Sequence, residues 1–282
     1  MMAGKLFLCA TPIGNLEDIT LRVLETLRSC DLIAAEDTRH TIGLLNHFEI
    51  KKPMTSYHEF NKVDKARVLV EKMQEGVNIA LVTDAGTPGI SDPGEELVRQ
   101  CVEAGVEVTS LPGPAACITA LTLSGLATRR FCFEAFLPMD KQDRAWVLKE
   151  LQSETRTIIL YEAPHRLVRT LKELRDALGE NRRISLCKEL TKIHETAFRT
   201  TIGEALEYYG ENDPRGEFVL VIEGKPIEEI LREDSAKWDS MTIPEHMEFY
   251  MSKGTPKKEA MKLVAADRGI SKRDVYAAML EE

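Results

Sequence analysis

Short apolar runs alternate with longer segments of helical periodicity through the first half of the chain. Each run has the length and aliphatic content of a buried strand; the runs lie at residues 5–10, 32–35, 78–82 and 106–110. Apolar residues between and after them recur at helical spacing, which predicts helices over residues 20–30, 62–75, 93–104 and 115–124. Strands that alternate with helices are typical of an α/β domain with a parallel sheet, which we expect over residues 1–124.

The pattern changes after residue 124, so we place a domain boundary at residues 124–129. Five further strands are predicted, at residues 130–136, 157–160, 183–188, 195–201 and 218–223. Two of them, 183–188 and 195–201, follow each other with no helix between, which is typical of antiparallel pairing. We therefore expect a second domain over residues 125–224, with a mixed sheet and an α+β arrangement.

A third pattern of three short helical segments ends the chain. Residues 225–240 are charged and aperiodic, so they are predicted to be a linker, and the helices are expected at 243–252, 256–268 and 271–280. The last two are joined by Arg-Gly-Ile-Ser at residues 268–271, where glycine suits a helix end and serine the next helix start. This arrangement over residues 241–282 resembles a helix-turn-helix.

Charge is distributed unevenly between this tail and the rest of the chain. The 282 residues carry a net charge of −9, which argues against a protein coated in nucleic acid. Residues 253–273 nevertheless hold seven lysines and arginines against two acidic residues. A solvated face of a small helical bundle and a nucleic-acid-binding surface explain this local excess equally well.

The six cysteines are scattered through apolar runs without metal-ligand spacing. We interpret them as reduced core residues of a cytoplasmic protein, and we expect no metal site. No apolar run is long enough to span a membrane, and the first ten residues lack the layout of a secretory signal.

A loop rich in breakers follows three of the predicted strands. The most marked is residues 82–94 (Val-Thr-Asp-Ala-Gly-Thr-Pro-Gly-Ile-Ser-Asp-Pro-Gly), and the others are at residues 11–15 and 111–116. Glycines let backbone groups approach a ligand closely, and ligands of open α/β sheets bind at the carboxyl ends of strands. A tight turn with Asp92 at the N-cap and Pro93 in the first helical turn is the competing interpretation for a single loop.

The sequence motifs of several common classes of enzyme are absent from this chain. The chain has no Gly-x-x-x-x-Gly-Lys-Ser/Thr loop, no Gly-x-Gly-x-x-Gly fingerprint and no Gly-x-Ser-x-Gly nucleophile elbow. What remains is a pair of domains with convergent loops, which suits a small cofactor held in a cleft.

Six motifs in order are similar to those of the tetrapyrrole-methylase superfamily of S-adenosylmethionine-dependent enzymes. They are Ala-Thr-Pro-Ile-Gly-Asn-Leu (10–16), Ala-Glu-Asp-Thr-Arg (35–39), the loop at 83–94, Leu-Pro-Gly-Pro-Ala (111–115), Tyr-Glu-Ala-Pro-His-Arg (161–166) and Gly-Glu-Phe-Val (216–219). Within the superfamily, the chain most resembles the bacterial ribosomal RNA small subunit methyltransferase I family over residues 5–224, and its tail is similar to that family's helix-turn-helix.

The resemblance implies a two-domain α/β fold, a homodimer, and methylation of the ribose 2′-oxygen of a decoding-centre cytidine (nucleotide 1402) in 16S ribosomal RNA. It implies S-adenosyl-L-methionine as the cofactor, folded between the two domains. The positions that match the cofactor site are Pro12, Ile13, Asp84, Ala85, Gly86, Thr87, Ile90, Gly113, Pro114, Ala115, Tyr161 and Ala163.

Transfer to a ribose hydroxyl requires that the hydroxyl lose its proton, and a positioned base would help. The candidates are Lys188, Glu189, Asp37 and His165, and no spacing argument decides among them. Lys188 is preferred slightly, because a lysine that ends a strand at a cleft can be desolvated.

Cations are the natural contacts for RNA phosphates. We assign Arg39 and Arg166 to this role, because a planar guanidinium fits phosphate well. The tail contributes Lys257, Lys258, Lys272 and Arg273, and a solvated face or an extended RNA track explains Arg182, Arg183, Lys192 and Arg199 equally well.

The main alternative is a methyltransferase of a tetrapyrrole or corrin, as relatives in the superfamily are. Such an enzyme has no need of a basic helix-turn-helix, so the tail separates the two readings. A non-enzymatic RNA-binding module would not need cleft loops from both domains.

Overall fold

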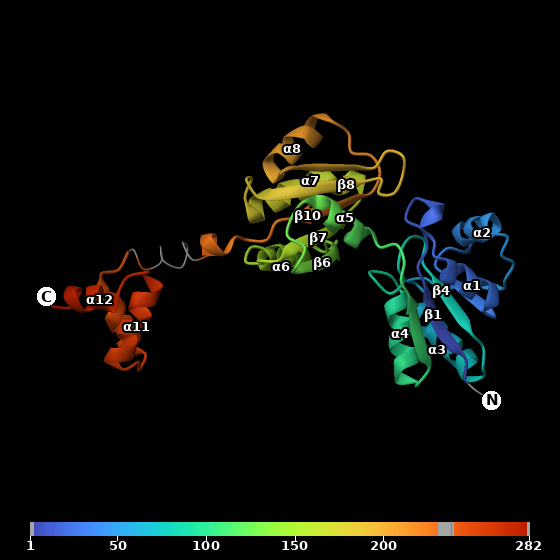
Figure 1. Cartoon of the computed structure of the whole chain (residues 1–282), viewed down its shortest axis with the longest axis horizontal. Coiled ribbons are helices and arrows are strands. Elements are labelled where there is room, and N and C mark those ends of the chain that lie inside the picture. The colour runs from blue at the N-terminus through green and yellow to red at the C-terminus, as the bar shows by residue number, and fades with distance from the viewer. Residues whose placement is uncertain (1–2, 231–237, 239, 281–282) are drawn as a thin grey trace. The chain divides into compact units, whose positions relative to one another are not determined.

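The protein, analysed as a computed structural model, is described at residues 3–230, 238 and 240–280. These fall into two compact units: residues 1–151 with 156–223, and residues 152–155 with 224–282. The first unit contains both sheets and the second contains the C-terminal helices, drawn in red in Figure 1. The α/β fold class, with a parallel first sheet, a mixed second sheet and a helical tail, is confirmed.

The first sheet has five parallel strands in the order β3-β2-β4-β1-β5. The strands are β1 Lys5–Cys9, β2 Leu32–Ala35, β3 Met54–Ser56, β4 Ile79–Val82 and β5 Glu107–Leu111. Between them run η1 Leu16–Asp18, α1 Leu21–Ser29, α2 Thr38–His47, α3 Lys62–Gln74 and α4 Gly94–Glu103. The sequence pattern missed the edge strand β3, because its three residues carry no apolar run.

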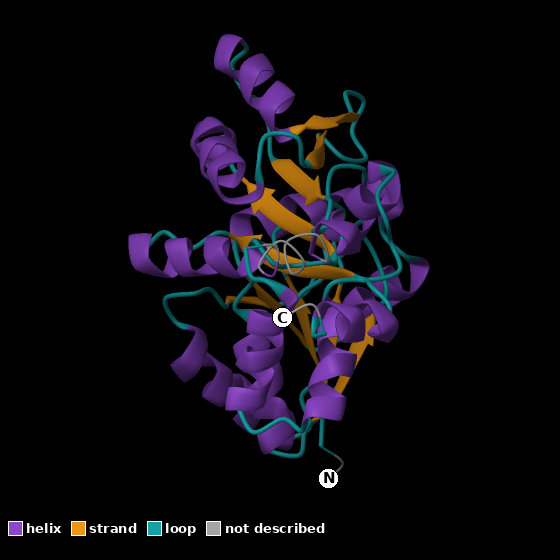
Figure 2. Ribbon diagram, turned by 90° about the vertical axis from the view of Figure 1, so that its left-hand side faces the viewer, coloured by secondary structure: helices purple, strands orange, loops and turns teal. Residues whose placement is uncertain are grey.

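Helices cover both faces of this sheet (Figure 2) because its strands are apolar on both sides. Leu6 and Leu8 of β1 pack with α3 and α4, whereas Cys9 packs with α1 and α2 on the other face. Burying such side chains is worth about 1.5–3 kcal/mol for each large aliphatic residue. Helices thus cover both faces of the sheet, and the loops that follow the strands lie at its carboxyl edge.

The second sheet has the order β6-β7-β10-β8-β9 and mixed strand directions. Its strands are β6 Phe131–Phe136, β7 Thr157–Glu162, β8 Arg183–Lys188, β9 Thr196–Thr201 and β10 Phe218–Ile222. Only β6 and β7 are parallel; β10 lies antiparallel between β7 and β8, and β9 pairs antiparallel with β8. The helices α6 Lys141–Leu151, α7 Pro164–Leu178 and α8 Ile202–Glu211 pack on one face.

Helix α5, Ala116–Ser124, covers the other face of the second sheet. Its Cys117, Ala120 and Leu121 pack with Ile159 of β7 and Val221 of β10 in one apolar cluster. The helix was expected to close the first domain at residue 124. By its packing it belongs to the second sheet, so the chain changes sheets between β5 and α5.

The C-terminal unit contains helices α10 Ile243–Ser252, α11 Lys257–Asp267 and α12 Lys272–Ala278. They share a small core of Met247, Ala260, Val264, Ala265 and Val275. The last helix starts at the N-cap Ser271, as predicted, with a capping box to Asp274. Residues 227–230 of the expected linker are helical, and residues 231–237 and 239 lie outside the described residues.

No helix in the described ranges is both long and apolar enough to cross a membrane.

Candidate active site

The loop after β4 is bonded directly to the loop after β1. The backbone N–H of Thr11 donates to the Gly86 carbonyl at 2.9 Å, and the N–H of Gly86 donates back to Thr11 at 3.1 Å. The Thr11 hydroxyl also donates to the Thr83 carbonyl at 3.1 Å. This isolated antiparallel bridge fixes residues 83–86 at the carboxyl edge of the first sheet, where an α/β sheet binds its ligand.

Two further bonds join the same loop to the loops after β2 and β5. The Asp37 N–H donates to Oδ1 of Asp84 at 3.1 Å, and the Thr87 hydroxyl donates to the Pro114 carbonyl at 2.9 Å. Residues 83–87 therefore join the loops after β1, β2, β4 and β5, which makes this part of the edge one preorganised wall.

The end of this loop is held by Asp92, whose carboxylate accepts the N–H groups of Gly89, Ile90 and Gly94. Helix α4 begins at Gly94, so Pro93 is its N-cap and not its first helical residue. The capped-turn interpretation predicted that Asp92 would accept backbone N–H groups, and it does. It also predicted that the helix would begin at Pro93, whereas the helix begins one residue later, at Gly94.

Two glycines allow close backbone approach at this wall. Gly86 has φ +89, a left-handed conformation that favours glycine. At Gly113 a Cβ atom would lie 2.5 Å from the Cβ of Ala10, so only glycine lets the loop after β5 pack against the end of β1.

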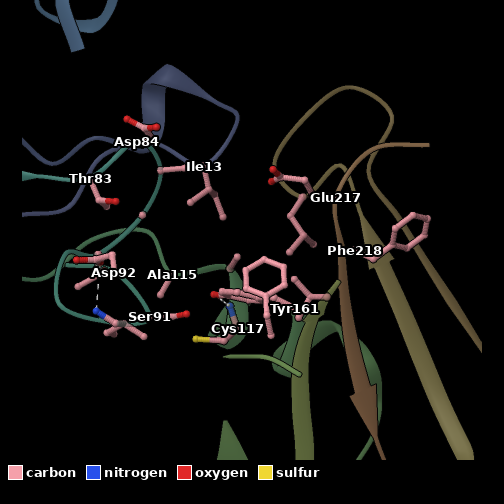
Figure 3. A pocket seen from close by; sticks show the side chains of 18 of the residues that line it. Ile13, Thr83, Asp84, Ser91, Asp92, Ala115, Cys117, Tyr161, Glu217 and Phe218 are labelled. Carbon is pink, nitrogen blue, oxygen red and sulfur yellow. Dashed lines mark hydrogen bonds between the residues drawn. The ribbon is translucent and has the colours of Figure 1, made fainter. Parts of the chain in front are cut away.

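A cavity of about 390 Å³ opens between the edges of the two sheets (Figure 3). The first-sheet side is lined by Ile13, Glu36, Thr83, Asp84, Ala85, Gly86, Thr87, Ile90, Ser91 and Asp92. The second-sheet side is lined by Ala115, Ala116, Cys117, Phe136, Tyr161, Glu162, Ala163, Glu189, Leu190, Lys192, Glu217, Phe218 and Val219.

Tyr161 at the end of β7 anchors the second wall. Its ring contacts Phe133 and Phe136 edge-on, and its hydroxyl accepts the N–H of Cys117 at 3.2 Å. Burial raises the pKa of the Tyr161 phenol above its usual range, so it stays protonated at neutral pH. The bond from Cys117 to the Tyr161 hydroxyl fixes the first turn of α5 against the second sheet.

The loop between β8 and β9 forms the rim of the second wall. Lys192 Nζ lies 3.1 Å from Oε1 of Glu189, and both residues line the cavity. Glu189 and Thr191 have φ of 53° and 65°, so two residues with side chains occupy the left-handed region. Gly14 packs closely against this loop. A Cβ atom at position 14 would lie only 2.7 Å from Cγ of Lys192, so a larger residue would not fit there without a shift.

Most of the predicted cofactor positions line the cavity. Three of the twelve do not: Pro12, Gly113 and Pro114. Gly113 and Pro114 instead shape the wall, through the approach to Ala10 and the bond from Thr87.

Only Glu189 among the four candidate bases lines the cavity. Lys188 ends β8 one residue after Cys187, which packs on the α5 face, so alternation along the strand directs Lys188 to the opposite face. His165 is exposed in the first turn of α7. The Asp37 carboxylate bonds Arg39, which holds the pKa of Asp37 well below its usual range.

The two arginines assigned to phosphates differ in their freedom. The Arg39 side chain is 90 % exposed and pairs with Asp37 at 2.7 Å. Arg166 is 19 % exposed, pairs with Glu162 at 3.4 Å and donates to the Leu137 carbonyl at 3.1 Å. The structure therefore uses the Arg166 guanidinium to hold its own fold.

The basic positions of the tail are exposed. They occupy the first turns of α11 and α12: Lys257, Lys258, Lys272 and Arg273. Of the residues that could extend an RNA track, Lys192 lines the cavity, whereas Arg199 donates to the Leu123 carbonyl.

Sequence reasoning gave no role to most of the acidic lining. Glu36, Glu162 and Glu217 all line the cavity, and Asp92, expected only as a helix cap, lines it as well. The signal for Glu217 was its motif, Gly-Glu-Phe-Val, directly before a predicted strand. The described residues contain no cluster of His, Cys, Asp and Glu that could hold a metal ion.

Solved structures share this fold. Diphthine synthase superposes with a TM-score of 0.62 at 14 % identity, covering 78 % of this chain and 90 % of that one. Uroporphyrin-III C-methyl transferase from Thermus thermophilus, complexed with S-adenyl homocysteine, superposes with a TM-score of 0.55 at 18 % identity, covering 78 % and 97 %.

Curated relatives match over nearly the whole chain. The ribosomal RNA small subunit methyltransferases I of Synechocystis sp. and Bacillus subtilis are 49 % and 47 % identical, covering 99 % and 98 % of this chain and 98 % and 94 % of theirs. The Thermotoga maritima protein of the same name is 45 % identical over 222 residues, which cover 79 % of this chain and 99 % of its own.

The model of the tetrapyrrole (corrin/porphyrin) methylases matches residues 5–206, which contain all of the cavity lining except Glu217, Phe218 and Val219. The protein therefore belongs to the tetrapyrrole methylase family and, within it, to the ribosomal RNA small subunit methyltransferase I family.

Proposed function

We propose that this protein is an S-adenosyl-L-methionine-dependent methyltransferase of 16S ribosomal RNA, acting on the ribose 2′-oxygen of a cytidine. The observation that carries the proposal is 44–49 % identity, over nearly the full chain, to relatives named ribosomal RNA small subunit methyltransferase I. The cavity between the sheets supplies the place for the reaction.

The residues present fit the cofactor. Its sulfonium and ammonium groups are cationic, and the described residues that line the cavity include six carboxylates and a single basic side chain, Lys192. The volume lies within the range of small-molecule sites. Gly86 faces the space beside Ile13 and the Pro114 carbonyl, where a side chain would crowd a flat ligand.

Asp84 and the backbone of residues 85–87 are the groups that would hold the cofactor on the first wall, with Ile13 and Ile90 as its apolar contacts. When bound, the cofactor supplies an electrophilic methyl group. The two walls orient the hydroxyl in line with that group, and alignment of this kind supplies much of the rate of a displacement. Tyr161, Phe136 and Val219 supply apolar surface on the second wall.

The RNA is expected to reach the cavity past Lys192 and Arg39, with the exposed cations of α11 and α12 as a second contact surface. The Thermotoga maritima relative is fully matched by 222 residues, which leaves about a fifth of this chain without a counterpart there. The tail's candidate residues are exposed lysines and an arginine, so we expect the tail to serve affinity for the RNA more than chemistry. A homodimer in the cytoplasm, working on the small ribosomal subunit, accords with the family.

A tetrapyrrole substrate is the second candidate, because the family model and the uroporphyrin-III C-methyltransferase neighbours carry that chemistry in their names. Those neighbours are only 14–21 % identical to this chain, which supports the fold alone. The far higher identity of the ribosomal RNA relatives favours RNA.

The experiment is transfer of labelled methyl from S-adenosylmethionine to small ribosomal subunits from cells that lack this protein. We expect label in a 2′-O-methylcytidine, and an at least hundredfold lower rate for Asp84→Ala, because it removes the carboxylate of the loop that joins the ends of β1, β2, β4 and β5. Unlabelled subunits, from a protein that binds the cofactor, would contradict the RNA assignment and make tetrapyrroles the next substrates to assay.

A further inference from the structure

Six carboxylates line the cavity within the described part of the chain, and five of them already accept hydrogen bonds or ion pairs from the protein. Each of these five is held in place by its partners in the protein. The sixth has no partner within the described residues, and it is therefore the group to examine for transfer of a proton.

Three of the engaged carboxylates stand on the first wall. Glu36 accepts the Thr83 hydroxyl at 2.8 Å, and Asp84 accepts the Asp37 N–H at 3.1 Å. Asp92 accepts three backbone N–H groups of its own loop.

The other two stand on the second wall. Glu162 is 1 % exposed and bonds the Thr170 hydroxyl, the Ala163 N–H and the Arg166 guanidinium. Glu189 is paired with Lys192 at 3.1 Å. Burial and pairing hold both groups in place.

Glu217 differs from these five. It is exposed, and within the described residues its carboxylate has no hydrogen-bond or ion-pair partner. It precedes the first residue of β10, and Figure 3 shows its side chain extending from that strand toward Ile13 on the opposite wall, while the ring of Phe218 points away from the cavity.

The residue before it explains this placement. Gly216 has φ +77, and a Cβ at that position would lie 2.5 Å from Oε1 of Glu189. The glycine thus lets the Glu189 carboxylate pack against the backbone, while the next side chain enters the cavity. Two carboxylates share this rim, one neutralised by Lys192 and one unpartnered.

We propose that Glu217 is the catalytic base, which takes the proton of the ribose hydroxyl as the methyl group is transferred. The proposal rests on the proposed function. The hydroxyl oxygen forms a bond to the methyl carbon, the bond from that carbon to sulfur breaks, and its electron pair stays on sulfur. The O–H proton passes to the Glu217 carboxylate and then to water, so no further reactant is needed.

The test is a single-turnover comparison of wild type, Glu217→Gln and Glu207→Gln on unmethylated small subunits. Glu207 is an exposed glutamate of α8 outside the cavity lining and serves as the matched control. General-base catalysis is typically worth about 10²–10⁴-fold. We therefore expect a loss of that size for Glu217→Gln and no change for Glu207→Gln.

Two binding measurements separate a base from a ligand-holding group. Calorimetric titration with S-adenosylmethionine and a filter-binding titration with small subunits should give affinities within about threefold of wild type for Glu217→Gln. In Glu217→Ala, added formate should restore part of the rate, because a free carboxylate can occupy the vacated space and take the proton.

Each contrary result overturns the proposal. A tenfold weaker affinity for the cofactor with an unchanged single-turnover rate would make Glu217 a cofactor ligand. An unchanged rate in Glu217→Gln, or a slow Glu217→Ala that formate does not restore, would show that the carboxylate takes no proton. Failure of the wild type to methylate the subunits would instead contradict the proposed function itself.

Discussion

The two walls of the cavity are built in different ways. The first-sheet wall is held by backbone: the Thr11–Gly86 bridge and the bonds from Asp37 and Thr87 join four loops into one piece. The second-sheet wall presents side chains from separate elements, with Tyr161 on β7, Lys192 after β8 and Glu217 before β10.

The difference indicates that the two walls have separate roles in cofactor binding and in catalysis. Backbone groups fixed by their neighbours suit the binding of a constant ligand, because they lose little freedom when it arrives. Side chains on a separate wall suit the handling of a proton and the reading of a substrate. Substitutions on the first wall should therefore act through stability and cofactor affinity, and those at the second-wall rim through rate.

The sharpest contrast lies within the second wall, between Glu162 and Glu217. Glu162→Ala removes the acceptor of the Thr170 hydroxyl and the ion-pair partner of Arg166, which keeps its bond to the Leu137 carbonyl. Removing one partner of a buried ion pair costs about 3–5 kcal/mol. Urea unfolding should show that loss as a lower midpoint.

Glu217→Ala is its counterpart, because that exposed carboxylate has no partner in the described chain to lose. Its unfolding free energy should stay within about 0.5 kcal/mol of wild type. Equal losses for the two variants would remove the distinction between a structural and an available carboxylate.

A smaller effect is expected from Gly113→Ala on the first wall. The new Cβ would lie 2.5 Å from that of Ala10, so the loop after β5 must move. Overpacking of this kind costs about 1–3 kcal/mol. Thermal unfolding and cofactor titration should both report the loss.

The combined variant Gly113→Ala with Ala10→Gly is the control, because it removes the opposing methyl group. It should recover much of the thermal midpoint and of the cofactor affinity. A double variant no better than the single one would show that the close approach does not shape this wall.

The smallest effect belongs to Thr87→Val, which deletes the hydroxyl that bonds the Pro114 carbonyl. One such bond is worth about 1 kcal/mol. Cofactor affinity should fall by about fivefold while the single-turnover rate at saturation is kept. Thr122→Val, which removes a hydroxyl that bonds only its own helix, should change neither.

Much of the fold could be predicted because the parallel strands are short apolar runs followed by breakers. The edge strand β3 has no apolar run that would predict it. It is a strand because its backbone pairs with β2, which the sequence pattern does not show. Helix α5 is predicted to close the first domain, but it packs on the second sheet. Its residues are apolar almost all round, and periodicity tells that a helix is buried without telling against which sheet.

For the site, the motifs located the loops but not every side chain. Nine of the twelve positions taken from the resemblance line the cavity, because backbone loops go where their strands end. Lys188 was preferred from its place at the end of a strand. Alternation along β8 places Lys188 and Cys187 on opposite faces, but only the packing of α5 on the Cys187 face shows that Lys188 points away from it.

Glu189 and Thr191 occupy a backbone region where an L-residue costs about 1–2 kcal/mol more than in its ordinary conformations. Glycine would relieve that cost at either position, at the expense of the side chain. If thermal stability alone were selected, we would therefore expect glycine to replace the residues with positive φ in the loop between β8 and β9. A consensus-stabilised version of this enzyme would be expected to lose its rim side chains first.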